Sequence, residues 1–444
     1  MALTDVLDAR FELTAHGTTV RTEALAGATT FLTMAYIIFV QPAVLSAAGM
    51  DFGAVLTATC LSTAFATALM AWLANYPIAV APAMGHNFFF AYSVVIGMQV
   101  PWRVALGAVA IAGIVFVLTA GIGLRERLIT AIPAAIKHAM AAGIGLLIAM
   151  VGLQWAGLIV AAPGTLVTLG NLHSPPVLLA VGALTLTAIL MARRVPGAML
   201  WGILASAAVG WALGLVQYQG IAGRPPSLLP TLLQLDVAGA LAPGMAAIVL
   251  VFFFLALFDS VGTLVAIGGQ AGLMRDGTLP RARQALLADA IGTVAGAVLG
   301  TSTVTAYVES SAGVAVGGRT GLASLVTAAL FLLSLLFYPI VRMIGGGYQT
   351  GGSTLYPVIA APLVLVGTLM MGSLRHVAWE DPTESVPAFL TLIMMPLTVS
   401  ITEGIAFGVL AYAVMKLASG RGREVHPLMY VFALLFLLRY MFLR

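Results

Sequence analysis

Charged residues are scarce in this sequence, and their scarcity decides the fold class. Only 8% of its 444 residues are charged and 61% are hydrophobic, whereas soluble domains carry roughly 25% charged residues. A soluble fold is therefore excluded. Apolar stretches of about 17 to 25 residues, each long enough to cross a hydrocarbon core of ~30 Å, recur along the whole chain. We expect an all-α polytopic protein in a lipid bilayer, with no extramembrane domain between its spans.

Cysteine and enzyme signatures are missing as well. The single cysteine, Cys60, excludes a disulfide within the chain and a metal site built from several cysteines. The sequence has no HExxH, no GxSxG and no motif that pairs a nucleophile with a histidine base, so we expect neither an enzyme nor a cofactor. The formal charge of +4 does not indicate nucleic acid, because the positive-inside rule accounts for a basic excess in a membrane protein. Residues 1–22 lack the apolar core of a cleavable signal.

The apolar stretches fall into two sets of seven, separated by a linker at 221–243 that contains GRPPSLLP. A last segment at 427–443, within the C-terminal part 421–444, carries Arg439. At about 17 residues it is short enough to lie at the interface rather than cross, so we assign 421–444 as a C-terminal interfacial segment, and whether 427–443 crosses the membrane stays open. The first half, 23–220, has spans near 24–48, 53–75, 83–98, 103–124, 135–158, 175–191 and 197–217. The second half, 244–420, has spans near 244–270, 284–300, 306–317, 321–341, 355–373, 385–399 and 402–418.

The positions of lysine and arginine predict an orientation. If the N-terminus is cytoplasmic, fifteen of the twenty basic residues lie on the inner side and three on the outer side, as the positive-inside rule requires. We therefore predict a multi-pass protein of the inner (plasma) membrane with cytoplasmic N- and C-termini and an even number of crossings. The outer set is Arg103, Arg224 and Arg342. The inner set is Arg10, Arg21, Arg125, Arg127, Lys137, Arg193, Arg194, Arg275, Arg281, Arg283, Arg319, Arg375, Lys416, Arg421 and Arg423.

The two halves share a defect at corresponding places. Seven spans per half insert the halves in opposite senses, as in transporters built from inverted repeats. Residues 77–93 are interrupted by prolines and a glycine, and residues 301–319, TSTVTAYVESSAGVAVGGR, by small and β-branched residues. We interpret each as an extended piece, 78–82 or 301–305, followed by a half-helix near the bilayer midplane. The N-termini of such half-helices offer free N–H groups to polar ligand atoms in a cavity.

Four carboxylates lie inside or beside apolar spans. Asp289 and Glu403 are near span ends, where a carboxylate in an early helical turn faces the positive end of the helix dipole. Asp259 and Glu309 lie within spans, where a charge costs about 2.5–3.5 kcal/mol and usually marks a substrate or ion path. A structural pair with backbone groups or an arginine is the alternative. Thr263 can form a hydrogen bond near Asp259, one helical turn away.

Four stretches resemble a known family in their order and residues. They are TEALAGATTFLTMAYIIFVQPAVLSAAGMD (22–51), ANYPIAVAPAMGHN (74–87), ALFDSVGTL (256–264) and TAYVESSAGVAVGGRTGLASLV (305–326). They resemble the hypoxanthine/guanine/adenine (purine) permease branch of the xanthine/uracil permease (nucleobase:cation symporter) family, over nearly the whole chain. The resemblance implies a uracil-permease-like fold of about fourteen helices in two inverted repeats, with short antiparallel strands in spans 3 and 10. It further implies a core domain (spans 1–4 and 8–11) and a gate domain (spans 5–7 and 12–14), through which a homodimer forms.

The resemblance also implies a function and its residues. It implies uptake of a purine nucleobase (hypoxanthine, guanine, adenine or xanthine) together with a proton. Asp259 and Glu309 would bind the base. A purine edge alternates N–H donors with ring-nitrogen acceptors, which two carboxyl groups, one of them protonated, can match. The preferred purine, the carboxyl group that carries the proton, and proton against sodium coupling stay open. Tyr307 and Val308 precede Glu309, and their backbone groups are candidates for facing the base.

The first half supplies further candidates. Asn87 and Phe88 hold the place that matches Glu309, and an aromatic ring there can stack on a purine. The family shows an apolar residue before this asparagine and a small one after it, where this chain has His86 and Phe88. His86 is a candidate proton carrier, with a packing histidine as the alternative. Met34 and Tyr36 are candidates in the first span, where ordinary helix packing is the alternative. The competing function is a transporter or channel for a small anion on the same architecture, against which two carboxylates argue.

Overall fold

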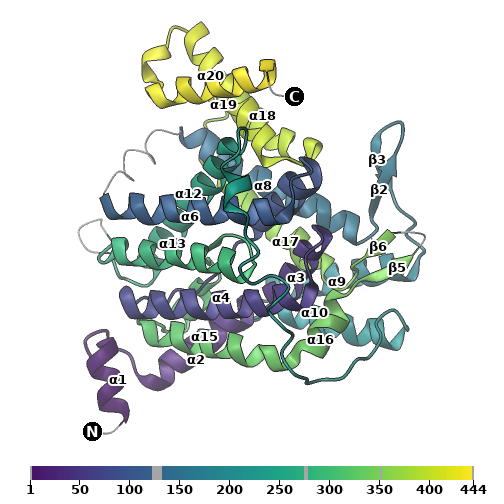
Figure 1. Ribbon diagram of the computed structural model, residues 1–444. Helices are drawn as coiled ribbons and strands as arrows, with labels where there is room; N and C mark the ends of the chain where they lie inside the picture. The colour runs from purple at the N-terminus through teal and green to yellow at the C-terminus, as the bar shows by residue number, and fades with distance from the viewer. Residues whose placement is uncertain (1–2, 123–132, 275–278, 351–352, 443–444) are drawn as a thin grey trace.

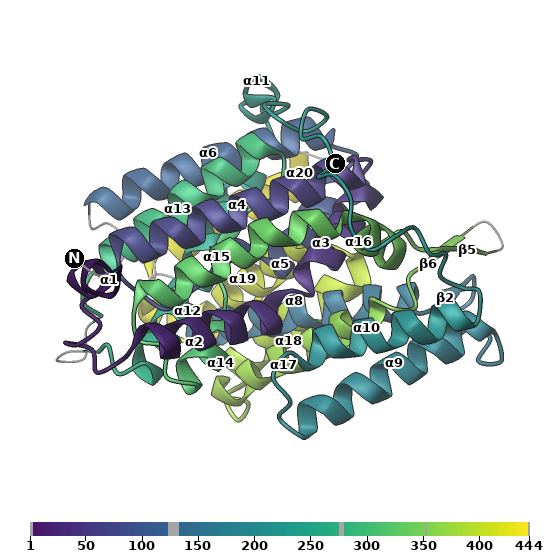
Figure 2. The same ribbon diagram turned by 90° about the horizontal axis from the view of Figure 1, so that it is seen from below.

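A computed structural model describes residues 3–122, 133–274, 279–350 and 353–442. Long helices lie side by side in one bundle, many of them along a common direction (Figures 1 and 2). Within the described residues, nine helices are long and apolar enough to cross a membrane. The chain is therefore a mostly helical, polytopic membrane protein. Arg125, Arg127, Arg275 and Arg444, which entered the count of basic residues, lie outside the described residues.

Polar side chains begin the helices of the first half. The Thr19 hydroxyl accepts a hydrogen bond from the backbone N–H of Thr22 at 3.2 Å, and the Asp51 carboxylate accepts one from Ala54 at 2.8 Å. The elements are α1 (Leu3–Phe11), α2 (Val20–Met34), α3 (Ile37–Ala47), α4 (Phe52–Leu73), β1 (Val80–Pro82), α5 (Met84–Phe88), the π-helix η1 (Phe89–Gly97), α6 (Trp102–Ile122), α8 (Ala134–Trp155), β2 (Ile159–Ala162), β3 (Leu166–Leu169), α9 (Pro175–Ala192) and α10 (Ala198–Ala212).

The second half uses the same local chemistry. Asp381 accepts from the N–H of Thr383 at 2.9 Å and Ser400 from that of Glu403 at 3.3 Å. The helices are α11 (Val237–Ala240), α12 (Ala246–Gln270), α13 (Ala282–Leu299), α14 (Ser310–Ala315), α15 (Gly321–Ser334), α16 (Tyr338–Gly345), α17 (Ala360–Met370), α18 (Pro382–Thr398), α19 (Ile401–Ala418) and α20 (Pro427–Phe442). The strands are β4 (Val304–Ala306), β5 (Tyr348–Thr350) and β6 (Ser353–Leu355), and short 3₁₀-helices are η2 (Leu335–Phe337), η3 (Met371–His376) and η4 (Gly422–Glu424).

A strand pair joins the two halves at the predicted defects. β1 and β4 are antiparallel, with Val80 opposite Ala306 and Pro82 opposite Val304. The contact extends beyond the strands, since the Ala83 N–H donates to the Thr303 carbonyl at 3.0 Å. Each strand leads into a short helix, α5 or α14, so the chain has an extended piece followed by a half-helix in both places. Every residue of both strands is buried, which satisfies the rule that irregular backbone at membrane depth must lie inside protein.

Two features differ from the sequence-based expectation. The first span, predicted as one helix, is broken at Ala35 and Tyr36, where Ile38 N–H bonds to the Ala35 carbonyl at 3.1 Å in place of the α-helical partner. The chain is also not purely helical, because β2 pairs with β3 and β5 with β6 in two further hairpins. The hydrophobic pattern did not predict the β2–β3 hairpin. Its strands, Ile159–Ala162 and Leu166–Leu169, are as apolar as the end of the preceding span and so could not be told from it by hydrophobicity.

The helices pack in two groups. α4 packs against α13 and α15, α2 against α14 and α15, and α6 against α12 and α13; separately, α8 packs against α17, α18 and α19, and α9 against α10 and α17. Glycine permits the closest approaches. A Cβ atom at Gly27 would lie 2.3 Å from the Ala323 carbonyl oxygen in the first group, and one at Gly143 would lie 2.6 Å from the Met395 sulfur in the second.

The last helix, α20, lies along α19. At one end the Tyr430 hydroxyl donates to the Gly422 carbonyl at 2.8 Å, just past the C-terminus of α19. At the other end the Arg439 guanidinium donates to Glu403 in the first turn of α19 at 2.7 Å. The two helices are therefore antiparallel.

Candidate substrate-binding site

Glu309 lies where β4 turns into α14, as the N-cap residue of that half-helix. Its carboxylate accepts a hydrogen bond from the Tyr36 hydroxyl at 2.7 Å, and the Thr33 hydroxyl donates to its backbone carbonyl at 3.3 Å. Both partners come from the first span, Thr33 from α2 and Tyr36 from the break that follows. Tyr36 was among the sequence candidates. Thr33 was missed, because most threonines in apolar helices bond only to their own helix and give no signal.

Asp259 lies in the middle of α12 and faces β4, since the Thr305 hydroxyl donates to its carboxylate at 3.0 Å. The Asp259 side chain is nevertheless exposed, as are its neighbour Gly262 and Val308 beside α14. The carboxylate therefore borders the strand pair on one side and open space on the other. Glu309 lies near enough for the two carboxylates to interact electrostatically. The structure thus brings the two sequence candidates into one site.

Hydroxyl groups, not cations, hold these two carboxylates. Within the described residues, the ion pairs involve Glu12, Asp381, Glu384, Glu403 and Glu424, and none involves Asp259 or Glu309. This counts against a structural ion pair with arginine. A carboxylate has about four acceptor positions, so each keeps lone pairs that a ligand with N–H groups can use.

Tyr307 joins the strands, and Val308 points outward. The Tyr307 hydroxyl donates to the Pro82 carbonyl at 2.5 Å, and its backbone N–H donates to the Ala79 carbonyl at 2.9 Å. The Val308 side chain is 55% exposed. The polar groups of Tyr307 therefore position the start of α14 relative to β1. Thr263 is buried one turn after Asp259 on α12.

Asn87 is fixed by the opposite half. Its side-chain carbonyl accepts a hydrogen bond from the Ser302 hydroxyl, and the Gln41 amide donates to the Thr301 hydroxyl at 2.9 Å beside it. The amide nitrogen of Asn87 is buried and has no hydrogen-bond partner among the described residues. Asn87 therefore retains an unused donor next to the strand pair, whereas its acceptor is occupied. Ser302 and Gln41 were not sequence candidates.

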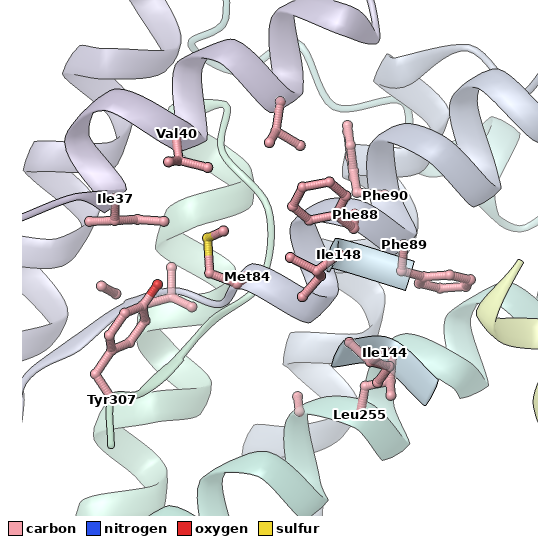
Figure 3. Close-up of a cluster of buried hydrophobic side chains, with 14 of the residues drawn as sticks. Ile37, Val40, Met84, Phe88, Phe89, Phe90, Ile144, Ile148, Leu255 and Tyr307 are labelled. Carbon is pink, nitrogen blue, oxygen red and sulfur yellow. The ribbon is translucent and has the colours of Figure 1, made fainter. Parts of the chain in front are cut away.

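Phe88 is packed on both sides. Its ring stacks on Tyr92 with a centroid distance of 5.4 Å and lies 6.5 Å from Trp155 of α8. Figure 3 places Phe88, Phe89 and Phe90 in one cluster of buried apolar side chains. In this conformation the Phe88 ring therefore packs the half-helix α5 against α8. A purine could stack on it only after Tyr92 or Trp155 moved.

His86 and Met34 are buried near the same half-helix and first span. Neither imidazole nitrogen of His86 has a hydrogen-bond partner of normal geometry among the described residues. Met34 is fully buried at the end of α2, within the main apolar core.

The other two intramembrane carboxylates differ from each other. Glu403 lies in the first turn of α19, as expected, and binds Arg439 and the Tyr440 hydroxyl. The expectation for Asp289 was wrong, because it lies in the interior of α13, fully buried, and accepts a hydrogen bond from Ser260 of α12. Its span begins two residues earlier than the hydrophobic pattern indicated.

Comparisons with known proteins agree with this architecture. A family described as "Permease family", the xanthine/uracil permeases, matches residues 21–407. The adenine permease AdeP of Escherichia coli is 46% identical over 99% of this chain and 96% of its own. The guanine/hypoxanthine permease PbuG of Bacillus subtilis is 46% identical over 98% of this chain and 99% of its own. The transmembrane domain of the cyanobacterium bicarbonate transporter BicA superposes with a TM-score of 0.62 over 90% of this chain and 97% of that chain, at 17% identity.

These matches define a class of membrane transporter, because the relatives are named permeases and not enzymes. The chain belongs to the xanthine/uracil permease family. The resemblance to its purine permease branch, drawn from four stretches of sequence, is confirmed by relatives named adenine and guanine/hypoxanthine permeases. The likeness to BicA extends to the fold alone.

Proposed function

We propose that this chain imports a purine nucleobase across the inner (plasma) membrane together with a proton. The observation that carries the proposal is the pair Asp259 and Glu309, two acidic side chains that share one site and accept hydrogen bonds from the hydroxyl groups of Thr305 and Tyr36. The names of AdeP and PbuG support a purine as the substrate. A small anion is a less suitable substrate, because the two carboxylates would repel it. Within the described residues, no ion pair places a lysine or arginine on either carboxylate to offset that repulsion.

The proton is proposed to travel on one of these carboxyl groups. Desolvation at membrane depth favours the neutral form of a carboxyl group, and a second carboxylate nearby favours it further. A protonated carboxyl group donates to a ring nitrogen of the base while its ionised neighbour accepts from an N–H group. Binding of the base and of the proton then support each other, which is the requirement for symport.

Transport is proposed to alternate between two faces by movement of a core domain against a gate domain. The packing of α2–α6 with α12–α15, and of α8–α10 with α17–α19, supports this division. We assign spans 1–4 and 8–11 to the core domain and spans 5–7 and 12–14 to the gate domain, in two inverted repeats at 23–220 and 244–420. Fourteen crossings up to the end of α19, a cytoplasmic N-terminus at 1–22 and a homodimer through the gate domain complete the proposal.

Uptake measurements test it. In cells that lack their own purine transporters, the chain should accumulate labelled adenine, guanine or hypoxanthine, and a protonophore should abolish accumulation while replacement of sodium should not. Asp259→Asn and Glu309→Gln should each abolish pH-driven accumulation. Wild-type accumulation by both variants would refute the assignment of the carboxyl groups. Competition by excess sulfate but not by guanine would favour the anion transporter instead.

A further inference from the structure

An apolar groove runs beneath α20, on a different part of the molecule from the carboxylates. Its volume is about 690 Å³, and its walls come from α8, α12, α19 and α20. A second cavity of about 440 Å³ lies between α6, α12 and α20. The two share the rings of Phe254 and Phe432, which meet edge to face at 5.5 Å. Cavities of roughly 300–1,000 Å³ hold drug-sized ligands, so each is large enough for a hydrocarbon chain.

The groove is long, and its polar group is at one end. Met429 lines it near the start of α20 and Arg439 near the end, a separation of about 15 Å at 1.5 Å per helical residue. Among the described residues that line it, Arg439 alone has a polar side chain. A water molecule is not stabilised in such a space, because it needs hydrogen bonds to two to four polar groups. The shape and lining therefore suit an elongated apolar ligand with one polar end.

Arg439 has a donor to offer such a ligand. One of its guanidinium nitrogens donates to Glu403 at 2.7 Å, and the Tyr440 hydroxyl bonds to the other oxygen of the same carboxylate. The second guanidinium nitrogen is buried and has no hydrogen-bond partner among the described residues. A buried donor without an acceptor is unfavourable, and an anionic oxygen relieves it best.

We propose that the groove binds one membrane phospholipid, with an acyl chain along α20 and a phosphate oxygen on the free nitrogen of Arg439. The charge complements Arg439, and the bilayer around the bundle supplies the ligand. The opposite face of α20 carries Leu434 and Leu437, which are 55% and 46% exposed and form an ordinary lipid-facing surface.

Native mass spectrometry of the full chain in mild detergent tests the proposal. With phosphatidylglycerol added, the wild type should retain one phospholipid per chain through repeated detergent washes. Ala247→Phe places a ring in the groove from α12 and should lower retention at least fivefold. Leu434→Phe, on the exposed face of α20, should retain phospholipid as the wild type does. If Ala247→Phe does not yield a monodisperse protein, Leu250→Phe, from the same wall, takes its place.

The contact between Arg439 and the phosphate is tested by comparing a lipid with a phosphate and a lipid without one. Arg439→Lys keeps a cation for Glu403 but removes the second guanidinium nitrogen. The wild type should prefer phosphatidylglycerol to diacylglycerol at least fivefold, and Arg439→Lys should bind the two equally. Equal retention by Ala247→Phe and the wild type overturns the proposal, as does a wild type without lipid preference. A dimer that dissociates on Ala247→Phe would make the groove an interface between copies, which also overturns it.

Discussion

The Tyr36 hydroxyl donates to the Glu309 carboxylate at 2.7 Å, although 273 positions separate the two residues. The bond connects the break between α2 and α3 with the N-cap residue of α14. A carboxylate at the start of a half-helix has several rotamers, and this bond selects one of them. The first half of the chain therefore sets the orientation of an acidic group that belongs to the second half.

Tyr36→Phe removes this bond and leaves the ring in place. A hydrogen bond to a charged group contributes about 1.5–3 kcal/mol, and 1.4 kcal/mol corresponds to a factor of ten in affinity. We expect the KM for purine uptake to rise about tenfold, with a change in its pH profile. Tyr76→Phe is the matched control, because the Tyr76 hydroxyl is buried without a hydrogen-bond partner among the described residues. Equal KM values for the two variants would contradict a role for the Tyr36 hydroxyl.

Thr305→Val tests the contact of the second carboxylate. The substitution removes the hydroxyl that donates to Asp259 at 3.0 Å but preserves the shape of the β4 side chain. Uptake at low purine concentration should fall roughly tenfold, for the same energetic reason. Thr303→Val, two residues earlier, is the control, since the Thr303 hydroxyl is buried without a partner among the described residues. A deficit of the same size in both variants would attribute the effect to the strand and not to Asp259.

Composition and local pattern predicted the helices and the two broken segments. The predicted spans overlap helices or half-helices, although the first span is divided into α2 and α3, because a hydrophobic stretch must form its own backbone hydrogen bonds in a bilayer. The place of Glu309 at the start of a half-helix also follows from its local sequence. These properties depend on residues within one segment, which a single sequence displays.

Partners from segments distant in the sequence could not be predicted. Thr33, Ser302 and Thr305 contact Glu309, Asn87 and Asp259 respectively, and each donor is an ordinary hydroxyl in its own segment. The pairing of Ser302 with Asn87 depends on the register of β1 against β4, and the other two pairs depend on how α2 and α12 pack, which no periodicity fixes. Glu23 was overlooked for a related reason: it precedes the first span, and its partners lie almost 300 positions later.

Glu23 should be a main source of stability at one end of the bundle. Its fully buried carboxylate accepts hydrogen bonds from the backbone N–H groups of Arg319 at 2.8 Å, Thr320 at 3.2 Å and Ala323 at 3.2 Å. Glu23→Ala leaves these donors buried without an acceptor, at about 1–3 kcal/mol for a buried donor. We expect a destabilisation of at least about 2 kcal/mol and a clear drop in Tm.

Glu12→Ala is the control for Glu23. Glu12 is exposed and pairs with Arg281 at 3.3 Å, and exposed ion pairs contribute about 0–1 kcal/mol. Thermal unfolding in one detergent, followed by tryptophan fluorescence, compares the variants. If Glu23→Ala unfolds at the temperature of Glu12→Ala, the carboxylate does not stabilise the turn before α15.

The α18–α19 hairpin should respond to acid. Arg421 donates to Asp381 at 2.6 Å and to Glu424 at 2.9 Å. These bonds lower the pKa of Glu424 to about 2 and the pKa of Asp381 below its ordinary value. Both groups bind protons more weakly in the folded state, so their stabilisation is complete above the unfolded pKa of about 4 and is lost as pH falls toward 2.

Arg421→Gln removes this dependence. Its Tm should lie below that of the wild type at pH 7, and the difference should narrow as pH falls from about 5 to 3. Arg423→Gln, two residues later, should follow the wild type, because Arg423 forms none of these ion pairs in the described residues. A Tm difference that stays constant over this range would show that Arg421 acts through packing and not through the two carboxylates.

The direction of α20 predicts that the chain crosses the membrane once more after α19. Contacts at both ends of the antiparallel pair, Tyr430 with Gly422 and Arg439 with Glu403, support a crossing. With fourteen earlier crossings and a cytoplasmic N-terminus, the C-terminus would then be external, whereas the basic residues predicted a cytoplasmic one.

Cys60→Ser, isosteric and buried, provides a cysteine-free background for a labelling experiment. Into it we would place Ser419→Cys, between α19 and α20, or a cysteine appended after residue 444. A membrane-impermeant maleimide should label the appended cysteine in intact cells and Ser419→Cys only after lysis. Labelling of both only after lysis would place α20 within one leaflet and restore the even number of crossings.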